Sequence, residues 1–206
     1  MKMSRTIHVV DDDDLARDVI SSLVATLPGV SVSAWESAEA FLTAAQDGAA
    51  PGVVLLDLNM PGLSGNEALR SLDHTRFPAI IVSGQGQITS AVESLKRGAI
   101  DFIEKPFTLE KLLGPLKIAF DMLDRNLAEE NRSDRDRERL ETLSEREVEV
   151  LSLLVDGLTN REVAEKLGLS VRTVESHRAR IMLKLDVSSF AEAIRLAVLA
   201  GIETPG

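Results

Sequence analysis

The sequence predicts an α/β fold built on a five-stranded parallel sheet, followed by a second domain made only of helices. Two patterns support this prediction. In the first part of the chain, short apolar runs that end in polar residues alternate with segments of helical period, as in parallel strands joined by helices. In the last part, helix-capping residues recur at short intervals. The length of 206 residues suits two domains.

Five apolar runs are expected to form the strands of the sheet. They span residues 7–10, 30–34, 53–56, 80–82 and 102–104. Right-handed connections between parallel strands place helices on both faces, which makes the sheet doubly wound. Because the chain has six Phe, one Trp and no Tyr, its core is expected to be aliphatic.

Polar side chains follow four of these runs. They are three carboxylates (Asp11, Asp12 and Asp57), the hydroxyl of Ser83 and the ammonium of Lys105. Parallel sheets bind ligands at the carboxyl ends of their strands, where these groups are expected to meet. Buried carboxylates repel each other and need a cation, and hard oxygen ligands open to a phosphate suit Mg²⁺. We interpret this edge as a site that moves a phosphoryl group onto a carboxylate. Alone, the run 11–14 reads equally well as a solvated loop with a helix cap.

The segment 124–141 separates residues 1–123 from residues 142–206. It carries dense mixed charge, two Leu and one Ala, and no Gly or Pro, so it cannot build a core of its own. It is either a solvated helix that continues the preceding one or a flexible linker.

Residues 142–206 are predicted to form four helices near 145–156, 160–167, 171–185 and 190–200. Capping boxes are expected at Ser144 with Glu147, Thr159 with Glu162 and Ser189 with Glu192, and helix-ending glycines at 157, 168 and 201. Only residues 168–170 join the second helix to the third, which is typical of a helix-turn-helix. The third helix, 171–185, therefore occupies the place of a recognition helix.

The charge pattern of the helix 171–185 favours DNA binding. The net charge of −10 argues against a protein coated in nucleic acid. This helix nevertheless carries four basic side chains, Arg172, Arg178, Arg180 and Lys184, against the single acid Glu175. Basic side chains neutralise phosphates, while Glu175, Ser176 and Ala179 are expected to face base edges. Val174, Ile181 and Leu185 recur at helical spacing and are expected in the core.

The sequence gives no support for cysteine-based sites, a signal peptide or membrane contact. Cysteine is absent, which excludes disulfides, thiolate catalysis and cysteine zinc sites. The N-terminal apolar stretch is broken by Asp11 to Asp14, so we expect no signal peptide and no membrane contact.

These motifs together resemble bacterial two-component response regulators of the FixJ/NarL class, with a receiver domain and a LuxR-type helix-turn-helix. The receiver matches are residues 10–12, Asp57 followed by residues 60–62, residues 83–84 and residues 105–107. The output matches are residues 143–147, 157–160, 162–164 and 171–177. The resemblance implies a sheet order of 2-1-3-4-5 and a cis Lys105–Pro106 bond.

The resemblance also implies roles for individual residues. Asp57 is the expected phosphoacceptor, with Mg²⁺ held by Asp12, Asp57 and the Asn59 carbonyl, and by Asp11 through water. Ser83 and Lys105 are expected to bind phosphoryl oxygens, and Phe102 to turn inward as Ser83 moves. Asn59 and Gln85 are expected to set the lifetime of the phosphoryl group. DNA contacts are expected from Arg172, Thr173, Glu175, Ser176, Arg178, Ala179, Arg180 and Lys184.

The resemblance implies a cytoplasmic regulator of transcription rather than an enzyme. Its expected partners are a sensor histidine kinase, double-stranded DNA, RNA polymerase and, on phosphorylation, a second copy of the chain. The last helix could supply a two-fold contact through Phe190, Ala193, Ile194 and Ala197. Two alternatives stay open at this point. One is a phosphotransfer adaptor whose second domain binds protein. The other is a phosphohydrolase, although such enzymes have a second acid where Asn59 stands.

Overall fold

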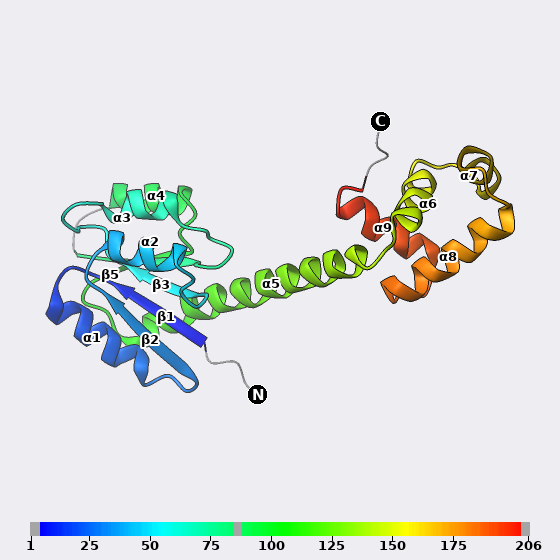
Figure 1. Cartoon of the computed structure of the whole chain (residues 1–206). Coiled ribbons are helices and arrows are strands. Elements are labelled where there is room, and N and C mark those ends of the chain that lie inside the picture. The colour runs from blue at the N-terminus through cyan, green and yellow to red at the C-terminus, as the bar shows by residue number, and fades with distance from the viewer. Residues whose placement is uncertain (1–4, 85–87, 203–206) are drawn as a thin grey trace. The chain divides into compact units, whose positions relative to one another are not determined.

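The computed structural model describes residues 5–84 and 88–202. The chain divides into two compact units, Met1–Ala128 and Glu129–Gly206, each with its own core (Figure 1). No helix in the described part of the chain is both long enough and apolar enough to cross a membrane.

The first unit is built on one parallel sheet. Its strands are β1 (Arg5–Val10), β2 (Val30–Trp35), β3 (Gly52–Leu56), β4 (Ala79–Ser83) and β5 (Asp101–Glu104). They lie in the order β2-β1-β3-β4-β5, and every pair is parallel. The predicted fold class and strand order are therefore confirmed.

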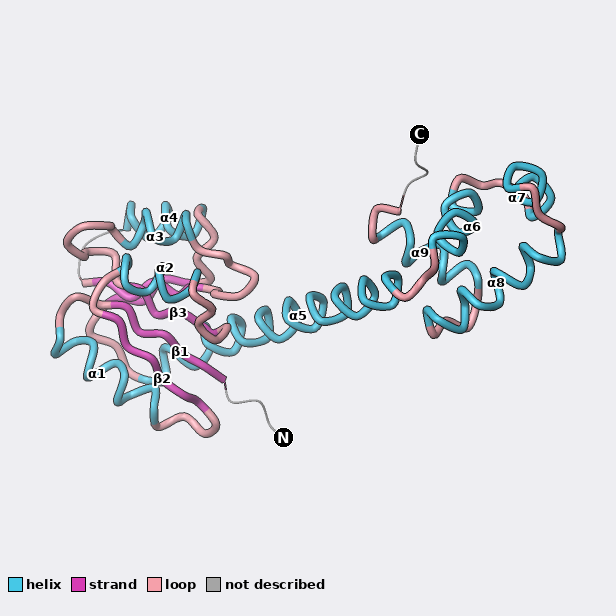
Figure 2. The backbone as a smooth tube through the Cα atoms, viewed as in Figure 1, coloured by secondary structure: helices cyan, strands magenta, loops and turns pink. Residues whose placement is uncertain are grey.

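Helices cover both faces of the sheet (Figure 2). They are α1 (Asp14–Ala25), α2 (Ala38–Gln46), α3 (Gly65–Ser71), α4 (Ile88–Lys96) and the first part of α5 (Leu109–Glu141). Val53 and Leu55 of β3 join the core under α1 and α5, whereas Val54 and Leu56 join the core under α2 and α3. Successive side chains of a strand point to opposite faces, so a strand buried on both sides is apolar throughout.

Aromatic rings fill part of the core under α2 and α3. The ring centroids of Phe41 and Phe77 lie 5.5 Å apart, and His8 lies 5.1 Å from Phe41. The expectation of an aliphatic core is wrong on this face. His8 is buried here, and its Nε2 lies 2.9 Å from the carbonyl of Ala50, while Trp35 Nε1 donates to its Nδ1 at 3.2 Å.

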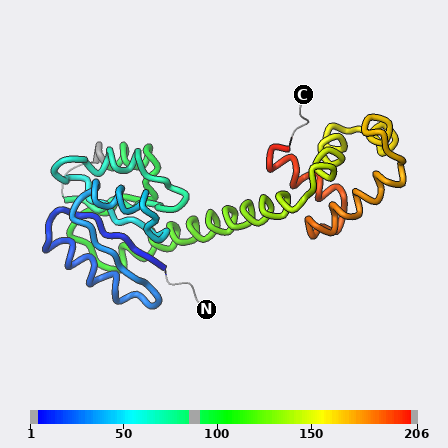
Figure 3. The backbone as a smooth tube through the Cα atoms, in the orientation of Figure 1, coloured from blue at the N-terminus to red at the C-terminus, as the bar shows by residue number. Residues whose placement is uncertain are grey.

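The second unit is helical, and Figure 3 traces its path from yellow-green to red. Its helices are α6 (Glu145–Val155), α7 (Asn160–Leu167), α8 (Val171–Leu185) and α9 (Phe190–Leu199), preceded by the last part of α5. These bounds agree with the predicted helices to within one residue. Residues 124–141 lie inside α5, where Leu127 packs on the core of the first unit and Leu140 is buried in the core of the second.

Caps set the ends of these helices. The capping boxes at Ser144 and Thr159 are both formed, and Gly168 ends α7 in the left-handed conformation at φ 66°. The third predicted box is wrong: Ser189 caps α9, but the Glu192 carboxylate accepts from Ser188 instead of from Ser189. The sequence spacing allows the amide of either Ser188 or Ser189 to donate to the Glu192 carboxylate, and it did not identify which of them does so.

Candidate phosphoacceptor site and DNA-binding surface

The carboxyl edge of the sheet brings the predicted acidic and basic residues together. Asp57 follows β3, and its amide donates to the carbonyl of Val10 in β1 at 2.9 Å. Lys105 follows β5, and its amide donates to the carbonyl of Ser83 in β4 at 2.8 Å. The Lys105–Pro106 bond is cis, as expected. Strand pairing therefore places these residues at one edge, although they are far apart in the sequence.

Lys105 joins the two buried carboxylates of this edge. Its Nζ lies 2.6 Å from Asp11 Oδ2 and 2.7 Å from Asp57 Oδ1. Asp11 is 2 % exposed and Asp57 is 6 % exposed. Burial by itself lowers the pKa of Lys105, but hydrogen bonds and the charges of Asp11 and Asp57 outweigh it and raise that pKa above its ordinary value. The ammonium is therefore charged at neutral pH.

The second oxygen of Asp57 faces the loop that follows β3. Its Oδ2 accepts the amide of Asn59 at 2.5 Å, and the Asn59 side chain donates to Ser83 Oγ at 3.4 Å. Ser83 is fully buried. Phe102 is half-buried and packs on the core under α2 and α3. Gln85 lies outside the described residues.

The acidic loop after β1 holds Asp11 and Asp12 differently. The buried Asp11 carboxylate accepts the amide of Asp13 at 3.1 Å, and Arg17 donates to the Asp11 carbonyl at 2.7 Å. Asp12 is exposed, and Asp13 caps α1. The described residues contain no ready-made group of three or more His, Cys, Asp or Glu side chains that could hold a metal ion. Two buried carboxylates nevertheless share one ammonium, which balances only one of their two negative charges. Carboxylate oxygens with this excess negative charge fit a hard divalent cation.

Gly65, which the sequence analysis did not single out, lets α3 start directly against Asp57. A Cβ at this position would lie 2.1 Å from the Asp57 carbonyl oxygen and 2.8 Å from the Cα of Leu58. The Gly65 amide donates to the carbonyl of Leu58 at 3.1 Å. Only glycine allows this close approach. The available signal was a glycine directly after the Ser64 helix cap, which does not reveal what lies beside it.

The second unit presents one face of α8 to solvent. Val174, Ile181 and Leu185 are buried, as predicted. The exposed residues of this helix are Val171, Arg172, Glu175, Ser176, Ala179, Arg180, Leu183 and Lys184. Thr173 is half-buried, and its hydroxyl lies 2.8 Å from that of Ser170, the cap of the helix. Arg172 and Arg180 form no ion pair within residues 5–84 and 88–202, so their charges are available to a ligand.

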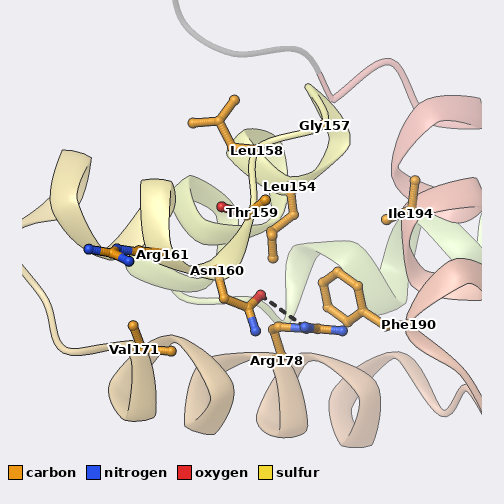
Figure 4. Close-up of a pocket in the computed structure, with 10 residues that line it drawn as sticks. All are labelled: Leu154, Gly157, Leu158, Thr159, Asn160, Arg161, Val171, Arg178, Phe190 and Ile194. Carbon is orange, nitrogen blue, oxygen red and sulfur yellow. Dashed lines mark hydrogen bonds between the residues drawn. The ribbon is translucent and has the colours of Figure 1, made fainter.

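Arg178 and Lys184 are already engaged inside the unit. Arg178 donates to Asn160 Oδ1 at 2.9 Å, and its guanidinium carbon lies 4.3 Å from the centre of the Phe190 ring. Figure 4 shows this arrangement at a hollow between α7, α8 and α9. Lys184 donates to Glu147 Oε2 at 2.7 Å and to the carbonyl of Thr142 at 2.9 Å. The predicted contacts of these two side chains with DNA therefore compete with contacts inside the unit.

The predicted two-fold face of α9 requires correction. Ala193 and Ala197 are fully buried, and Phe190 packs on the core of the unit. Ala193 and Ala197 are therefore core residues rather than part of an open contact face, whereas Phe190 and Ile194 are half-buried at the hollow between α7, α8 and α9. The exposed side of α9 carries Ala191, Arg195, Val198 and Leu199. The same apolar period serves either a core or an interface, and packing decided between them.

Comparison with known proteins supports both halves of this description. Residues 7–117 match the response regulator receiver domain, and residues 141–197 match the bacterial regulatory proteins of the luxR family. The transcriptional regulatory protein FixJ of Rhizobium meliloti (strain 1021) is 41 % identical over 198 residues, which cover 95 % of this chain and 96 % of that protein.

Two solved structures extend the likeness over nearly the whole chain. The response regulator StyR shares 31 % identity at a TM-score of 0.79, over 95 % of this chain and 99 % of that one. Full-length FixJ from B. japonicum shares 35 % identity at a TM-score of 0.55, over 98 % of this chain and 99 % of that one. A receiver domain implies a histidine kinase partner, and a LuxR-type domain implies DNA binding. The chain therefore belongs to the two-component response regulators that combine a receiver domain with a LuxR-type helix-turn-helix, and it is a DNA-binding regulator of transcription.

Proposed function

We propose that the regulator accepts a phosphoryl group on Asp57 from a sensor histidine kinase, and that the modified state controls DNA binding by α8. The observation that carries this proposal is the buried cluster at the sheet edge, in which Lys105 lies 2.7 Å from Asp57 and 2.6 Å from Asp11. A nearly buried carboxylate beside a fixed ammonium is suited to receive a group that brings negative charge.

The transfer needs little from the protein beyond position and charge. An oxygen of Asp57 bonds to phosphorus as the phosphorus–nitrogen bond of the donor phosphohistidine breaks. Lys105 is charged and already in place, so it can turn from the carboxylate to a phosphoryl oxygen without crossing the site. The Asn59 amide holds the other carboxylate oxygen and orients the group.

The site also suits Mg²⁺. We assign its ligands to the carboxylates of Asp12 and Asp57 and the carbonyl of Asn59, with Asp11 acting through water. Asp11 is the more buried acid and is paired with Lys105, whereas Asp12 is exposed to incoming ions. Bound Mg²⁺ supplies neutralisation of the charge on the transferred group.

The chemical change reaches the surface of the receiver through Ser83 and Phe102. Ser83 Oγ accepts from the Asn59 side chain at 3.4 Å, so its hydroxyl can donate to a phosphoryl oxygen placed on Asp57. Movement of Ser83 leaves room for the half-buried Phe102 ring to turn inward. Ser94 of α4 donates to Asn66 at 3.0 Å, which links α4 to α3 beside the same edge.

We assign DNA recognition to the exposed face of α8. Arg172 and Arg180 supply attraction to phosphates, while Glu175, Ser176 and Ala179 are exposed and short enough to approach base edges. Phosphorylation is proposed to bring two copies together on half-sites about one DNA turn apart, in the cytoplasm, where they can meet RNA polymerase.

The test is selection of bound fragments from total genomic DNA, with and without acetyl phosphate and Mg²⁺. Wild type is expected to become phosphorylated and to enrich a defined set of fragments, and Asp57→Asn to do neither. Asp47→Asn is the matched control, because Asp47 ends α2 away from the sheet edge. Acid-labile phosphate on Asp57→Asn at the wild-type level contradicts the assignment. A folded wild type that binds no DNA at low salt favours the protein-binding adaptor.

A further inference from the structure

Lys184 lies on the recognition helix but directs its charge into the second unit. Its Nζ donates to Glu147 Oε2 at 2.7 Å and to the carbonyl of Thr142 at 2.9 Å. The Glu147 side chain is 5 % exposed, so the ammonium faces a carboxylate that water hardly reaches. Thr142 and Glu147 flank the junction between α5 and α6, and Lys184 therefore ties α8 to that junction.

Glu147 has a second task at the same point. Its Oε2 also accepts the amide of Ser144 at 2.8 Å and the Ser144 hydroxyl at 3.0 Å, which completes the cap of α6. Burial by itself raises the pKa of Glu147, but hydrogen bonds from Lys184 and Ser144 outweigh it and lower the pKa to about 2. The carboxylate is thus charged at every ordinary pH and needs Lys184 as its partner.

A neighbouring contact joins the same two elements. Arg139, near the end of α5, lies 3.3 Å from the Asp186 carboxylate. Asp186 ends α8 and is left-handed at φ 53°, the only non-glycine residue with positive φ in the described ranges. The ion pair is exposed and contributes little by itself. It nevertheless links the residue that ends α8 to the end of α5.

We propose that Lys184 is a positioning residue, which fixes the C-terminal turn of α8 to the α5–α6 junction through Glu147 and Thr142, and does not contact DNA phosphates. The proposal rests on the proposed DNA binding by α8. A phosphate could recruit this ammonium only by drawing it away from a buried carboxylate, which would leave that charge unpaired. Arg180 is also on α8 and exposed but has no such partner in the described part of the chain, which makes it the matched phosphate contact.

Neutralising Lys184 and Glu147 together is expected to restore the stability and the DNA affinity that are lost when either one is neutralised alone. Lys184→Met and Glu147→Gln are compared, singly and together, in the full-length phosphorylated chain. Each single variant is expected to lower the melting temperature of the second unit and to weaken DNA binding by about tenfold or more. The double variant is expected to recover both, with a wild-type salt slope. Arg180→Met is expected to lower the slope by about one.

Three results overturn the proposal. One is a double variant whose salt slope falls by about one, as for Arg180→Met. Another is a double variant that does not fold, and the third is additive losses of melting temperature, because either shows that the two charges do not compensate each other. If wild type binds no DNA, the proposed function fails instead, and the thermal comparison still tests the Lys184–Glu147 pairing by itself.

Discussion

Asp57 keeps 6 % of its surface exposed at the edge of the sheet, whereas Arg172 and Arg180 lie exposed on α8. At the sheet edge, two carboxylates share one ammonium out of reach of most water, so electrostatic interactions are strong and any unpaired charge is costly. On α8, water and salt screen the charges, and their effect appears only against a polyanion. We propose that the buried cluster serves chemistry at Asp57, and that the exposed charges of α8 serve contact with DNA.

The same contrast between a buried and an exposed charge recurs inside the second unit. In the second unit, Lys184 is on the same helix as Arg180 but behaves like Lys105, because it faces a buried carboxylate. Residue type therefore does not tell which charges are structural. The exposed fraction of the partner side chain shows whether a charge is structural.

Loss of the Lys105 charge is expected to have the largest effect on stability. In Mg²⁺-free buffer, Lys105→Met leaves Asp11 and Asp57 buried without a cation, which should cost the first unit about 3–5 kcal/mol of unfolding free energy. Denaturant unfolding followed by the fluorescence of Trp35, which lies in this unit, measures the loss. Lys111→Met removes the same charge from an exposed position on α5 and should change stability by less than about 0.5 kcal/mol. Equal losses in the two variants would show that burial does not distinguish these charges.

A methyl group at Gly65 should be the next most damaging change. Gly65→Ala places a Cβ against the Asp57 backbone, so we expect a loss of about 1–3 kcal/mol and slower phosphorylation by acetyl phosphate. Lys117→Ala, at an exposed position of α5, is the control and should change the free energy of unfolding by less than about 0.5 kcal/mol. A Gly65→Ala protein with normal stability and phosphorylation would mean that the loop can move at no cost.

Substitution on the exposed face of α8 should leave folding intact and change recognition. Glu175→Ala is expected to relax preference at one base position by about 1–3 kcal/mol of discrimination, with unfolding changed by less than about 0.5 kcal/mol. Competition binding with single-base variants of a selected DNA fragment measures this loss of base discrimination. Glu165→Ala removes an exposed acid from α7 and serves as the control. Relaxation of the same size in both proteins would remove Glu175 from the base-facing set.

The two units are also expected to respond differently to acid. Burial lowers the pKa of His8 below 6.5, only partly offset by its hydrogen bond to Ala50. Neutral His8 therefore stabilises the first unit above about pH 6.5, and this contribution is lost as pH falls through the folded-state value. The Glu147 contribution to the second unit is complete above about pH 4.5 and is lost between about 4.5 and 2.

Unfolding measured against pH separates the two effects. Trp35 fluorescence reports the first unit, and the part of the circular dichroism transition that this fluorescence does not follow reports the helices of the second unit. His8→Phe should remove the loss of stability of the first unit below about pH 6.5 and leave the loss between about pH 4.5 and 2 unchanged. Glu147→Gln should do the reverse. His8 Nε2 faces a carbonyl and its Nδ1 accepts from Trp35, so a proton added at Nδ1 displaces the Trp35 bond. A first unit insensitive to pH between 5 and 7 would contradict this arrangement.

Much of the fold could be predicted because its signals are local. Short apolar runs between polar residues indicated five strands, and Ser144, Thr159 and Ser170 marked the starts of three helices that the structure confirms. The face of α8 that carries Glu175, Ser176 and Ala179 followed from helical spacing alone, and these residues are exposed. The placement of Phe190 and Ala197 could not be predicted, because the same spacing serves a core or an interface.

The sequence by itself determined which residues end each strand, which helix carries excess basic charge, and where that helix begins, because backbone propensity and periodicity act over a few positions. That Asp11, Asp57 and Lys105 meet could be predicted from the strand ends, but the tertiary structure decided which of these charges pair directly and which charges of the second unit meet. Lys105 and Asp11 are 94 positions apart, and Lys184 and Glu147 are 37 apart. The first pairing depends on the order of the strands, and the second depends on the packing of α8 against the start of α6. A charge that is shielded from water with its partner stabilises the fold, whereas an exposed charge remains available to a ligand.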